Sequence, residues 1–351
     1  MKIIYVTGVI SLLILIIGCS TVPQPNLPNP LKVAPKITDD EMKIIREGND
    51  LHDKGKFKQA LQKYYQVLND NPDNITAMYE LAFTYKELGN YDSTFSYLFK
   101  SIEYKSELYP LCYDMLGTCY DEKGHPEFAV EVYKKGIEIQ PFYLLYFNLA
   151  ITQINIKQFK DAEENLIKAL ELNPHHPGSN YTLSVLYYNQ NKRIPSILAS
   201  LKFLLLEPNT QRSQYTRNSI YQLVFSRVQK EHGVTNVYLT GDTTNSYNSI
   251  DFSLTASIAL GDFKEVLANG NEFKIMQRIL KETLPHINDK NSDFMSIYFL
   301  KFFKDLYNKN FETVMSYYIF QNSDISEVHD WIFENRDKIQ EFENWIRDYK
   351  Y

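Results

Sequence analysis

Apolar, small and polar positions recur between residues 41 and 208 with a period near 34 residues. Prolines mark the period, because Pro72, Pro141, Pro174 and Pro208 follow one another at spacings of 69, 33 and 34 residues, and the first gap holds two periods. Periods of this length are typical of stacked helical hairpins, in which a single unit cannot bury its apolar face alone. The pattern therefore predicts five consecutive hairpins over 168 residues.

Small residues return at one place in every unit. Gly48, Ala82, Gly117, Ala150 and Ser184 occupy corresponding positions in successive units. Small side chains let two helix axes approach closely, so we expect these positions to mark the crossing of the two helices of each hairpin.

The turn between the two helices has its own signal. Gly55, Gly89 and Gly124 stand there in the first three units, and Lys157 and Asn191 take that place in the last two. Glycine, and to a lesser degree asparagine, tolerates the left-handed backbone conformation that commonly ends a helix. These five positions therefore predict where each first helix ends.

Each second helix opens on an aromatic residue that a small residue follows, as in Phe57 with Ala60 and Phe159 with Ala162. We expect this large-into-small packing to fill the core of the hairpin. The whole pattern resembles the tetratricopeptide repeat. The resemblance implies an all-α fold, a right-handed superhelical stack of helix hairpins followed by a helical C-terminal region with degenerate hairpins. The repeats would span residues 41–74, 75–109, 110–142, 143–176 and 177–210.

The chain after the last repeat is predicted to begin with a capping helix over residues 211–233, which Gly233 ends. Residues 234–249 are rich in Thr, Asn, Gly and Asp and predict a loop or a domain joint. The C-terminal region as a whole, residues 234–351, is predicted to be helical. An apolar stripe at helical spacing carries both tryptophans, Trp331 and Trp345, and we expect it to pack as core.

The first residues carry a different pattern. Lys2 precedes an apolar run over residues 9–17 that ends in Gly18-Cys19. A charged start and a short apolar centre are typical of a secretory signal, here residues 1–18, and the run is shorter than the ~20 residues that span a membrane. Its end resembles the bacterial lipobox, which implies that Cys19 becomes acylated.

Acyl chains on Cys19 would attach the mature protein to a membrane without spanning it. Residues 19–40 contain five prolines and predict an extended tether. Ser20 stands where an aspartate would retain a lipoprotein in the inner membrane. The resemblance therefore implies an outer membrane lipoprotein of the bacterial cell envelope, on either the periplasmic or the surface face.

Composition fits a folded body with an ample core. The chain is 44% hydrophobic and 23% charged, and it contains 27 Tyr, 21 Phe and 2 Trp. Its formal net charge is -6, and no basic stripe occurs along it. Nucleic-acid binding normally needs clustered lysine and arginine on one face, so we expect no nucleic-acid partner.

Motifs of enzymes and metal sites do not occur in the sequence: it has no phosphate-binding glycine loop, no Gly-x-Ser-x-Gly and no His-Glu-x-x-His. His175 and His176 are adjacent in a turn without further ligands nearby, so we expect no metal. Cys112 and Cys119 are about 10 Å apart on one helix, too far for a disulfide, and are predicted to be buried packing. We expect a protein without enzymatic activity and without a cofactor.

The resemblance implies a concave groove that the first helix of each repeat lines. Its predicted members are apolar and aromatic: Ile45, Tyr79, Phe83, Leu111, Leu144, Phe147, Ile151, Ile154, Tyr181, Val185 and Tyr188. The cationic residues with which some relatives clamp a peptide carboxylate are absent, and only Asn49 or Asn148 could serve. A C-terminal carboxylate is therefore not the expected ligand.

Exposed apolar surface is unfavourable by about 25 cal/mol per Å², so we expect something to cover part of the groove. Two coverings are open: a protein or peptide partner with apolar anchors, or the C-terminal region of the chain itself. The first functional hypothesis is a non-enzymatic adaptor anchored in the envelope. The second is a glycan- or other ligand-binding envelope lipoprotein. The third is an enzyme within residues 250–351, although no sequence motif supports it.

Overall fold

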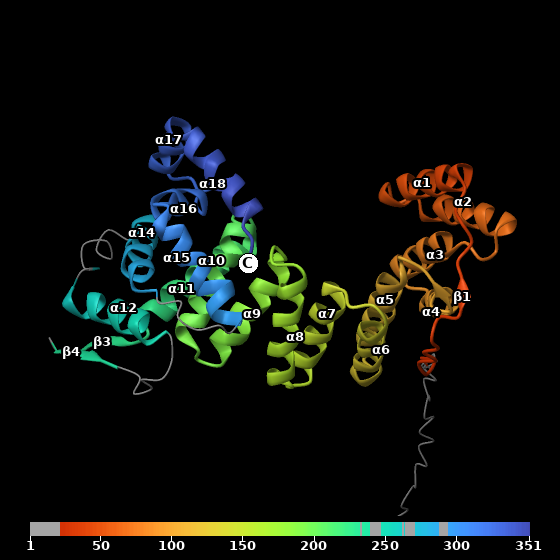
Figure 1. The fold of residues 1–351 in the computed structure, drawn as a ribbon, viewed down its shortest axis with the longest axis horizontal. Helices are drawn as coiled ribbons and strands as arrows, with labels where there is room; N and C mark the ends of the chain where they lie inside the picture. The colour runs from red at the N-terminus through yellow and green to blue at the C-terminus, as the bar shows by residue number, and fades with distance from the viewer. Residues whose placement is uncertain (1–21, 232–233, 239–246, 262, 264–270, 288–293) are drawn as a thin grey trace, which may run out of the picture. The chain divides into compact units, whose positions relative to one another are not determined.

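The computed structural model describes residues 22–231, 234–238, 247–261, 263, 271–287 and 294–351 (Figure 1). The predicted signal segment and Cys19 lie outside the described residues. The chain forms two compact units, Met1–Val132 and Tyr133–Tyr351. Helix hairpins dominate both, which confirms the predicted all-α fold of stacked hairpins, and the strands among the described residues form two short two-stranded sheets.

Antiparallel helices make up most of the first unit. They are α1 (Asp39–Asp53), α2 (Phe57–Asp70), α3 (Ile75–Glu87), α4 (Tyr91–Ser101), α5 (Tyr109–Glu122) and α6 (Pro126–Ile139), which continues into the second unit. Side-chain caps start several of them. Thr38 and Glu41 form a capping box at α1, and Asn74 and Asn90 cap α3 and α4. Local sequence thus sets where these helices begin.

Gly48 shows why the first helix of a hairpin needs a small residue. A Cβ atom at this position would lie 2.4 Å from Cε1 of Tyr64 on α2, which is fully buried. Tyr64 donates a hydrogen bond from its hydroxyl to Oδ1 of Asn49 at 2.7 Å. The predicted close crossing of the two helices is therefore confirmed in this hairpin.

The turns of the hairpins adopt the left-handed backbone conformation that the sequence predicts. Positive φ angles occur at Gly55 (69°), Gly89 (71°), Gly124 (79°), Lys157 (66°) and Asn191 (56°). The same conformation returns at Gly261 (92°) and Asn310 (57°) in the C-terminal region, where degenerate hairpins are expected. A non-glycine residue rarely adopts this conformation outside such helix ends.

The segment before α1 corrects one expectation. Strand β1 (Lys32–Val33) pairs in parallel with β2 (Tyr104–Lys105), which lies between α4 and α5. Tyr120 donates a hydrogen bond to the carbonyl of Pro23 at 2.8 Å, and Ala34 packs against the cluster of Ile75, Met78 and Tyr104. The predicted tether is extended here, but it is not a free spacer, because its backbone and side chains bind the first unit.

Two repeat hairpins and the C-terminal helices make up the second unit. Its α-helices are α7 (Tyr143–Asn155), α8 (Phe159–Leu172), α9 (Pro177–Asn189), α10 (Arg193–Leu206), α11 (Gln211–Phe225), α12 (Asn248–Leu260), α14 (Glu272–Thr283), α15 (Phe302–Asn308), α16 (Glu312–Tyr318), α17 (Ser326–Glu334) and α18 (Arg336–Asp348). A 3₁₀ turn (Leu284–His286) follows α14, and a π-helical turn (Ser296–Lys301) precedes α15.

Helix α10 lies at the centre of the second unit. It packs on α9 within its hairpin, and α11, α12 and the π-helical turn cover its other sides. Leu201 and Phe203, which lie two positions apart and therefore on different sides of the helix, are both buried. One continuous apolar core joins the last repeats to the C-terminal helices.

The predicted capping helix is shorter than expected. Helix α11 ends at Phe225. Strands β3 (Val228–Glu231) and β4 (Val234–Val237) follow it and pair in antiparallel orientation, with Val228 opposite Val237. The prediction of helix to residue 233 and of a loop from residue 234 is wrong here. Valine favours strands because its branched side chain restricts the helical rotamers.

Both tryptophans are partly buried and pack against the core of the second unit, as predicted. Trp331 on α17 stacks on Tyr317 with ring centroids 4.0 Å apart, and Trp345 on α18 lies 5.2 Å from Phe302. The apolar stripe forms two helices rather than one, because the chain breaks at Asn335 between α17 and α18.

Candidate binding groove

The predicted groove residues of the first unit differ in accessibility. Ile45 is 1% exposed and belongs to the α1/α2 core, so it cannot line an open groove, which corrects the expectation for this residue. Tyr79, Phe83 and Leu111 are half-buried. Phe83 contacts the ring of His52 with centroids 4.8 Å apart.

In the second unit the structure brings four predicted residues together around one apolar cavity of about 500 Å³. It lies between α7 and α9 and reaches the start of α8. We call it the apolar pocket. Its lining residues are Ile151, Ile154, Asn155, Phe159, Tyr181, Thr182, Val185, Leu186, Asn189 and Gln190. Residues three or four apart share one face of a helix, which explains why Ile151 with Ile154 and Tyr181 with Val185 meet here.

A second cavity of about 250 Å³ continues this surface between α9, α10 and α11. We call it the hydroxyl pocket. Its lining residues are Tyr181, Ser184, Val185, Tyr188, Asn189, Ser196, Ser200, Tyr215, Thr216 and Ser219. The two cavities share Tyr181, Val185 and Asn189, so together they form one surface, the α9 groove.

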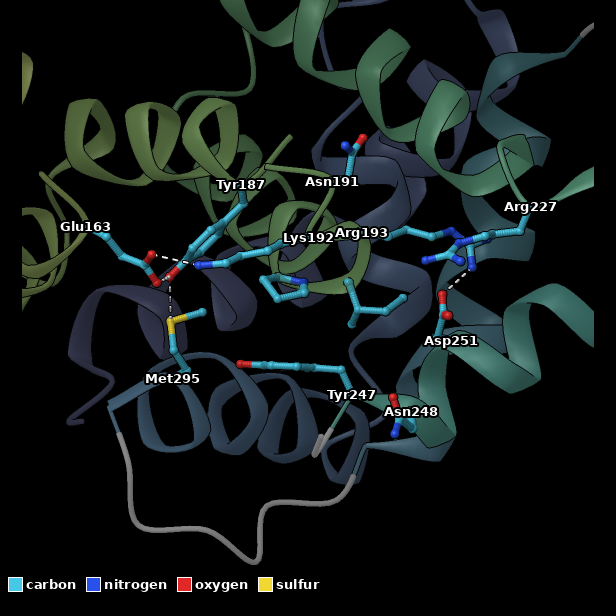
Figure 2. A pocket seen from close by; sticks show the side chains of 12 residues that line it. Glu163, Tyr187, Asn191, Lys192, Arg193, Arg227, Tyr247, Asn248, Asp251 and Met295 are labelled. Carbon is cyan, nitrogen blue, oxygen red and sulfur yellow. Dashed lines mark hydrogen bonds and ion pairs between the residues drawn. The ribbon is translucent and has the colours of Figure 1, made fainter. Parts of the chain in front are cut away.

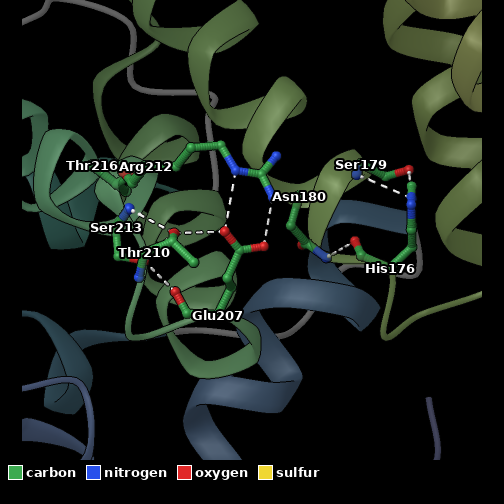
Figure 3. Close-up of polar contacts among 8 residues, drawn as sticks. All are labelled: His176, Ser179, Asn180, Glu207, Thr210, Arg212, Ser213 and Thr216. Atoms are coloured by element: carbon green, nitrogen blue, oxygen red, sulfur yellow. Dashed lines mark hydrogen bonds and ion pairs between the residues drawn. The ribbon is translucent and has the colours of Figure 1, made fainter. Parts of the chain in front are cut away.

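The start of α9 is fixed by His176 (Figure 3). Its Nδ1 accepts a hydrogen bond from the backbone N–H of Ser179 at 3.2 Å, and Asn180 donates to the carbonyl of His176 at 3.1 Å. Burial, with a smaller contribution from the charge of Arg212, lowers the pKa of His176, which keeps the imidazole neutral and able to accept. The cap holds the turn from which Tyr181 projects.

The start of α11 is held by a second polar cluster (Figure 3). Thr210 and Ser213 form a reciprocal cap. The carboxylate of Glu207 accepts hydrogen bonds at 2.6 Å from the Thr210 hydroxyl and from Nη2 of Arg212. The residues of α11 that line the hydroxyl pocket therefore follow directly on a constrained first turn.

The α9 groove exposes apolar side chains without charges. Phe159 is 44% exposed, Val185 40%, Tyr188 36% and Tyr215 58%. Among the described residues that line either pocket, none is charged. Several large apolar side chains exposed together mark an interaction surface more often than a single one does.

Sequence reasoning missed part of this groove. Phe159 was expected inside its hairpin core, but it opens α8 with its ring at the mouth of the apolar pocket. Tyr215 lies on α11, beyond the last predicted repeat, although its aromatic side chain was a visible signal. Of the remaining predicted members, Phe147 packs edge-on against His176 at 4.7 Å, and Leu144 is half-buried outside both pockets.

The C-terminal region covers a different surface. The hydroxyl of Tyr298 donates to the carbonyl of Pro174 at 2.6 Å, and Asn180 bonds the same hydroxyl at 2.9 Å. These contacts lie at the turn before α9. No described residue beyond Ser219 lines the apolar or the hydroxyl pocket, so the described part of the C-terminal region does not fill these two cavities.

A polar cavity of about 330 Å³ lies between α10 and the C-terminal region (Figure 2). Four of its charged residues form two ion pairs. Glu163 accepts hydrogen bonds from Nζ of Lys192 at 2.7 Å and from the Tyr187 hydroxyl at 3.0 Å. Arg193 forms a buried ion pair with Asp251. Burial lowers the pKa of Arg193, and the negative charge of Asp251 partly offsets this decrease. This cluster joins elements of the second unit.

Both Cys112 and Cys119 are buried, as predicted, and burial raises the pKa of each thiol to about 12, which keeps them protonated and unreactive at neutral pH. In the described part of the chain, no group of three potential metal ligands meets. No helix of that part is long and apolar enough to cross a bilayer.

Comparison with known sequences identifies the repeat. The family profile described as TPR repeat matches residues 48–89, and the profile described as tetratricopeptide repeat matches residues 111–143 and 144–176. Tetratricopeptide repeats are therefore present in this chain, as the periodicity predicted. A chain of such repeats is a scaffold with an extended binding surface.

Several known proteins are similar to parts of the chain. The Hsp70-Hsp90 organising protein of Plasmodium falciparum (isolate 3D7) is 29% identical over 108 residues. The match covers 29% of this chain and about a fifth (19%) of that protein. PilF of Pseudomonas aeruginosa is 16% identical with a TM-score of 0.43, covering 53% of this chain and 89% of that chain. YrrB, a repeat protein with an unusual peptide-binding site, is 18% identical with a TM-score of 0.39, covering 51% and 94%.

Proposed function

We propose that the tetratricopeptide repeats of this chain serve as a non-enzymatic protein-interaction scaffold, and that the α9 groove binds an apolar segment of a protein partner. The observation that carries the proposal is the apolar pocket. It is a preformed cavity of about 500 Å³, lined by Ile151, Ile154, Tyr181 and Val185, and no described residue fills it.

The geometry favours an apolar anchor on a peptide. Helices α7 and α9 present parallel rows of apolar side chains, between which a helical or extended segment can place one or two side chains. Because the caps at His176 and Thr210 already hold the start of α9 and of α11, little ordering is needed on binding. Asn155, Asn189 and Gln190 at the rim offer amide groups to the backbone of the segment.

We infer that the scaffold is anchored to a membrane through acyl chains on Cys19, as an envelope lipoprotein. The support is the sequence pattern of residues 1–19 alone. Metabolic labelling with a clickable fatty acid tests it. Label should reach the wild-type chain and not the Cys19→Ala variant, and an unlabelled wild-type chain would exclude acylation.

The groove proposal is tested with matched aspartate substitutions. Val185→Asp and Ile154→Asp place a charge in the apolar pocket, and we expect each to weaken partner capture at least tenfold because the charge would lose its hydration on binding. Leu172→Asp is the control, since Leu172 is 51% exposed on α8 and lies outside both pockets. The readout is quantitative mass spectrometry of proteins that co-purify with each variant.

Equal capture by all three variants would exclude the groove as the partner site. The glycan-binding hypothesis keeps one supporting observation, the exposed rings of Tyr188 and Tyr215. Retention on a glycan array with no protein partner, lost on replacing these two rings by leucine, would favour that hypothesis instead.

A further inference from the structure

We propose that a polar cavity at the start of α11 binds a carboxylate or phosphate group through the guanidinium of Arg217. The cavity, which we call the Arg217 pocket, has a volume of about 220 Å³. It lies between residues 208–217 and the turn after α16, residues 319–323. Among the described residues that line it, none also lines a pocket of the α9 groove, so the inference goes beyond the proposed function and does not depend on it.

Arg217 carries a charge that no other side chain of the pocket balances. It is the only charged residue among the described residues that line the cavity, and the others are amides, hydroxyls and apolar side chains. The charge of Glu272 acts on Arg217 from a distance, but no described carboxylate forms an ion pair with it. The carboxylate of Glu207 is bound by Thr210 and Arg212 instead (Figure 3).

One edge of the Arg217 guanidinium has no hydrogen-bond acceptor. Nη1 donates to the carbonyl oxygens of Pro208 and Ile319 at 3.4 and 3.3 Å, and both distances exceed the usual range for N–H···O bonds. Nε is buried without an acceptor, and no described residue accepts a hydrogen bond from Nη2. Nε and Nη2 present two parallel N–H groups on one edge, an arrangement that binds two oxygen atoms of one carboxylate or phosphate.

The hydroxyl of Ser323 is a second polar group without a partner. Its Oγ is buried and forms no hydrogen bond with any described residue. Ser323 lines the pocket from the turn after α16, whereas Arg217 lines it from α11. Buried hydroxyl groups are nearly always paired in folded proteins, so this hydroxyl is a candidate donor to a ligand. An anionic oxygen can accept hydrogen bonds from the hydroxyl and from the guanidinium.

The surroundings of Arg217 also favour an anion. Burial lowers the pKa of Arg217, but an arginine side chain stays protonated at neutral pH, so the charge persists where it is less hydrated than on the surface. The ring of Phe320, with its centroid 4.9 Å from Cζ, attracts the cation but supplies no oxygen acceptor. Thr210 and Gln211 bring the N-terminus of α11 to the same cavity, and a helix N-terminus carries a partial positive charge.

These features select an oxyanion over other ligand groups. A cation would be repelled by Arg217, and no described carboxylate lines the pocket to hold it. The amides of Asn209, Gln214 and Asn322 donate and accept, so they suit neutral and charged ligands alike. A neutral carbonyl could accept from the guanidinium but would leave its charge unbalanced. The selection therefore rests on the charge of Arg217 and on its free edge, which fits two oxygen atoms of one group.

Binding of small anions to the full chain tests the proposal. Isothermal titration calorimetry measures the affinity of inorganic phosphate and of acetate, with sodium chloride holding the ionic strength constant. Phosphate also stabilises proteins by its exclusion from their surface, so a shift in thermal unfolding alone would not report binding. We expect both anions to bind the wild type, and phosphate more tightly because its charge is larger.

Substitutions separate the charge from the hydrogen-bond geometry. Arg217→Gln removes both, and we expect it to weaken phosphate binding at least about tenfold. Arg217→Lys keeps the charge without the paired N–H groups and should lie between the two, and Ser323→Ala should weaken binding about threefold. Arg46→Gln, which removes an exposed arginine on α1, is the control and should bind as the wild type does. Circular dichroism and urea unfolding check that each variant is folded.

Two peptides distinguish the sources of the anion. A short capped peptide carries a single glutamate, and its control carries glutamine at the same place. Tighter binding of the glutamate peptide than of acetate, with this gain lost in Arg217→Gln, would identify an acidic side chain of a partner protein. Tighter binding of phosphate than of the glutamate peptide would instead identify a phosphate group as the ligand.

Equal phosphate affinity of the wild type and of Arg217→Gln would overturn the proposal. Absence of binding by phosphate, acetate and the glutamate peptide would overturn it as well. Neither result bears on the α9 groove, because the aspartate substitutions at Val185 and Ile154 test that surface separately.

Discussion

Lys202 shows at the scale of a single residue how burial disfavours the charged form of a side chain. Lys202 on α10 is fully buried, and within the described residues its ammonium group finds no hydrogen-bond acceptor. Its Nζ lies 3.2 Å from the ring centroid of Phe302 and 4.9 Å from that of Tyr351. Aromatic faces compensate for part of the lost hydration. Burial still lowers the pKa of Lys202 well below its ordinary value.

Replacing this charge should stabilise the protein. We expect Lys202→Met to raise the free energy of unfolding at pH 7 by about 1–3 kcal/mol, because methionine fills the site without a charge to desolvate. Between the lowered folded pKa and the unfolded value near 10.4, the unfolded chain binds the proton more tightly, so wild-type stability rises with pH. Urea unfolding from pH 7 to 10 should show this rise in the wild type and a smaller one in the variant. A less stable variant would contradict it.

His176 provides a second prediction about a single residue, in which the free energy of unfolding changes below neutral pH. Its folded pKa lies below the ordinary value of 6.5, so the unfolded chain takes up the proton first as the pH falls. The stability contributed by the neutral cap is complete above pH 6.5 and declines below it.

His176→Asn should keep the cap, because asparagine accepts the same hydrogen bond, and should flatten this decline. Thermal unfolding between pH 7.5 and 5 measures it. His175 also has a lowered pKa, through burial and the charge of Lys202, so part of the decline should persist. An identical pH dependence in the variant would show that His176 does not contribute.

Residue patterns predicted the turns well and the groove only in part. Lys157 and Asn191 were recognised as turn residues because left-handed backbone is a local property of each helix end. Ile45 and Phe159 were misplaced because exposure depends on which neighbouring helix packs on each face. A repeat position alone does not determine that packing.

At the scale of elements, the pairing of β1 with β2 ties the N-terminal segment to the first unit. The backbone N–H of Lys32 donates to the carbonyl of Glu103 at 3.1 Å, and its ammonium group pairs with the Glu103 carboxylate. Lys32→Pro removes the N–H donor and the charge together. We expect residues 22–36 to be cleaved at least tenfold faster by a nonspecific protease, with unchanged helix content.

Lys32→Arg is the matched control, since it keeps both the donor and the charge and should cleave as the wild type does. Equal cleavage of the wild type and the proline variant would show that the pairing is not formed in solution. Sequence predicted the extension of this segment from its prolines. It could not predict the pairing, because residues 32 and 104 meet only through the fold.

The same limit applies to β3 and β4. Val228 was assigned to a helix because a short run of apolar residues fits both periods. Val234 and Val237 were assigned to a loop because Thr, Asn, Gly and Asp are frequent in residues 234–249, and only the strand pairing shows that both segments are strands.

At the scale of the molecule, the C-terminal region stabilises the last repeat hairpin by covering α10. Truncation after Lys230 would expose Phe203, Leu204 and their neighbours in the shared core. We expect the truncated chain to aggregate or to lose several kcal/mol of stability, because large buried side chains contribute about 1.5–3 kcal/mol each. Size-exclusion chromatography and thermal unfolding measure this outcome.

A monomeric truncated chain with wild-type stability would show that the C-terminal helices form a separate body. Aggregation by itself does not report on the α9 groove, because the described C-terminal residues do not line its pockets. Two surfaces are therefore distinct: the C-terminal helices pack on α10, whereas no described residue of the C-terminal region lines the pockets of the α9 groove.

Site-specific photocrosslinking in the cells that produce the protein tests this central claim most directly. A photoreactive residue at Val185 in the groove is compared with one at Leu172, which is similarly exposed on α8. The account predicts that Val185 attaches a defined protein, that Leu172 does not, and that Ile154→Asp abolishes the crosslink. Equal crosslinking from both positions, or none from Val185, would contradict it.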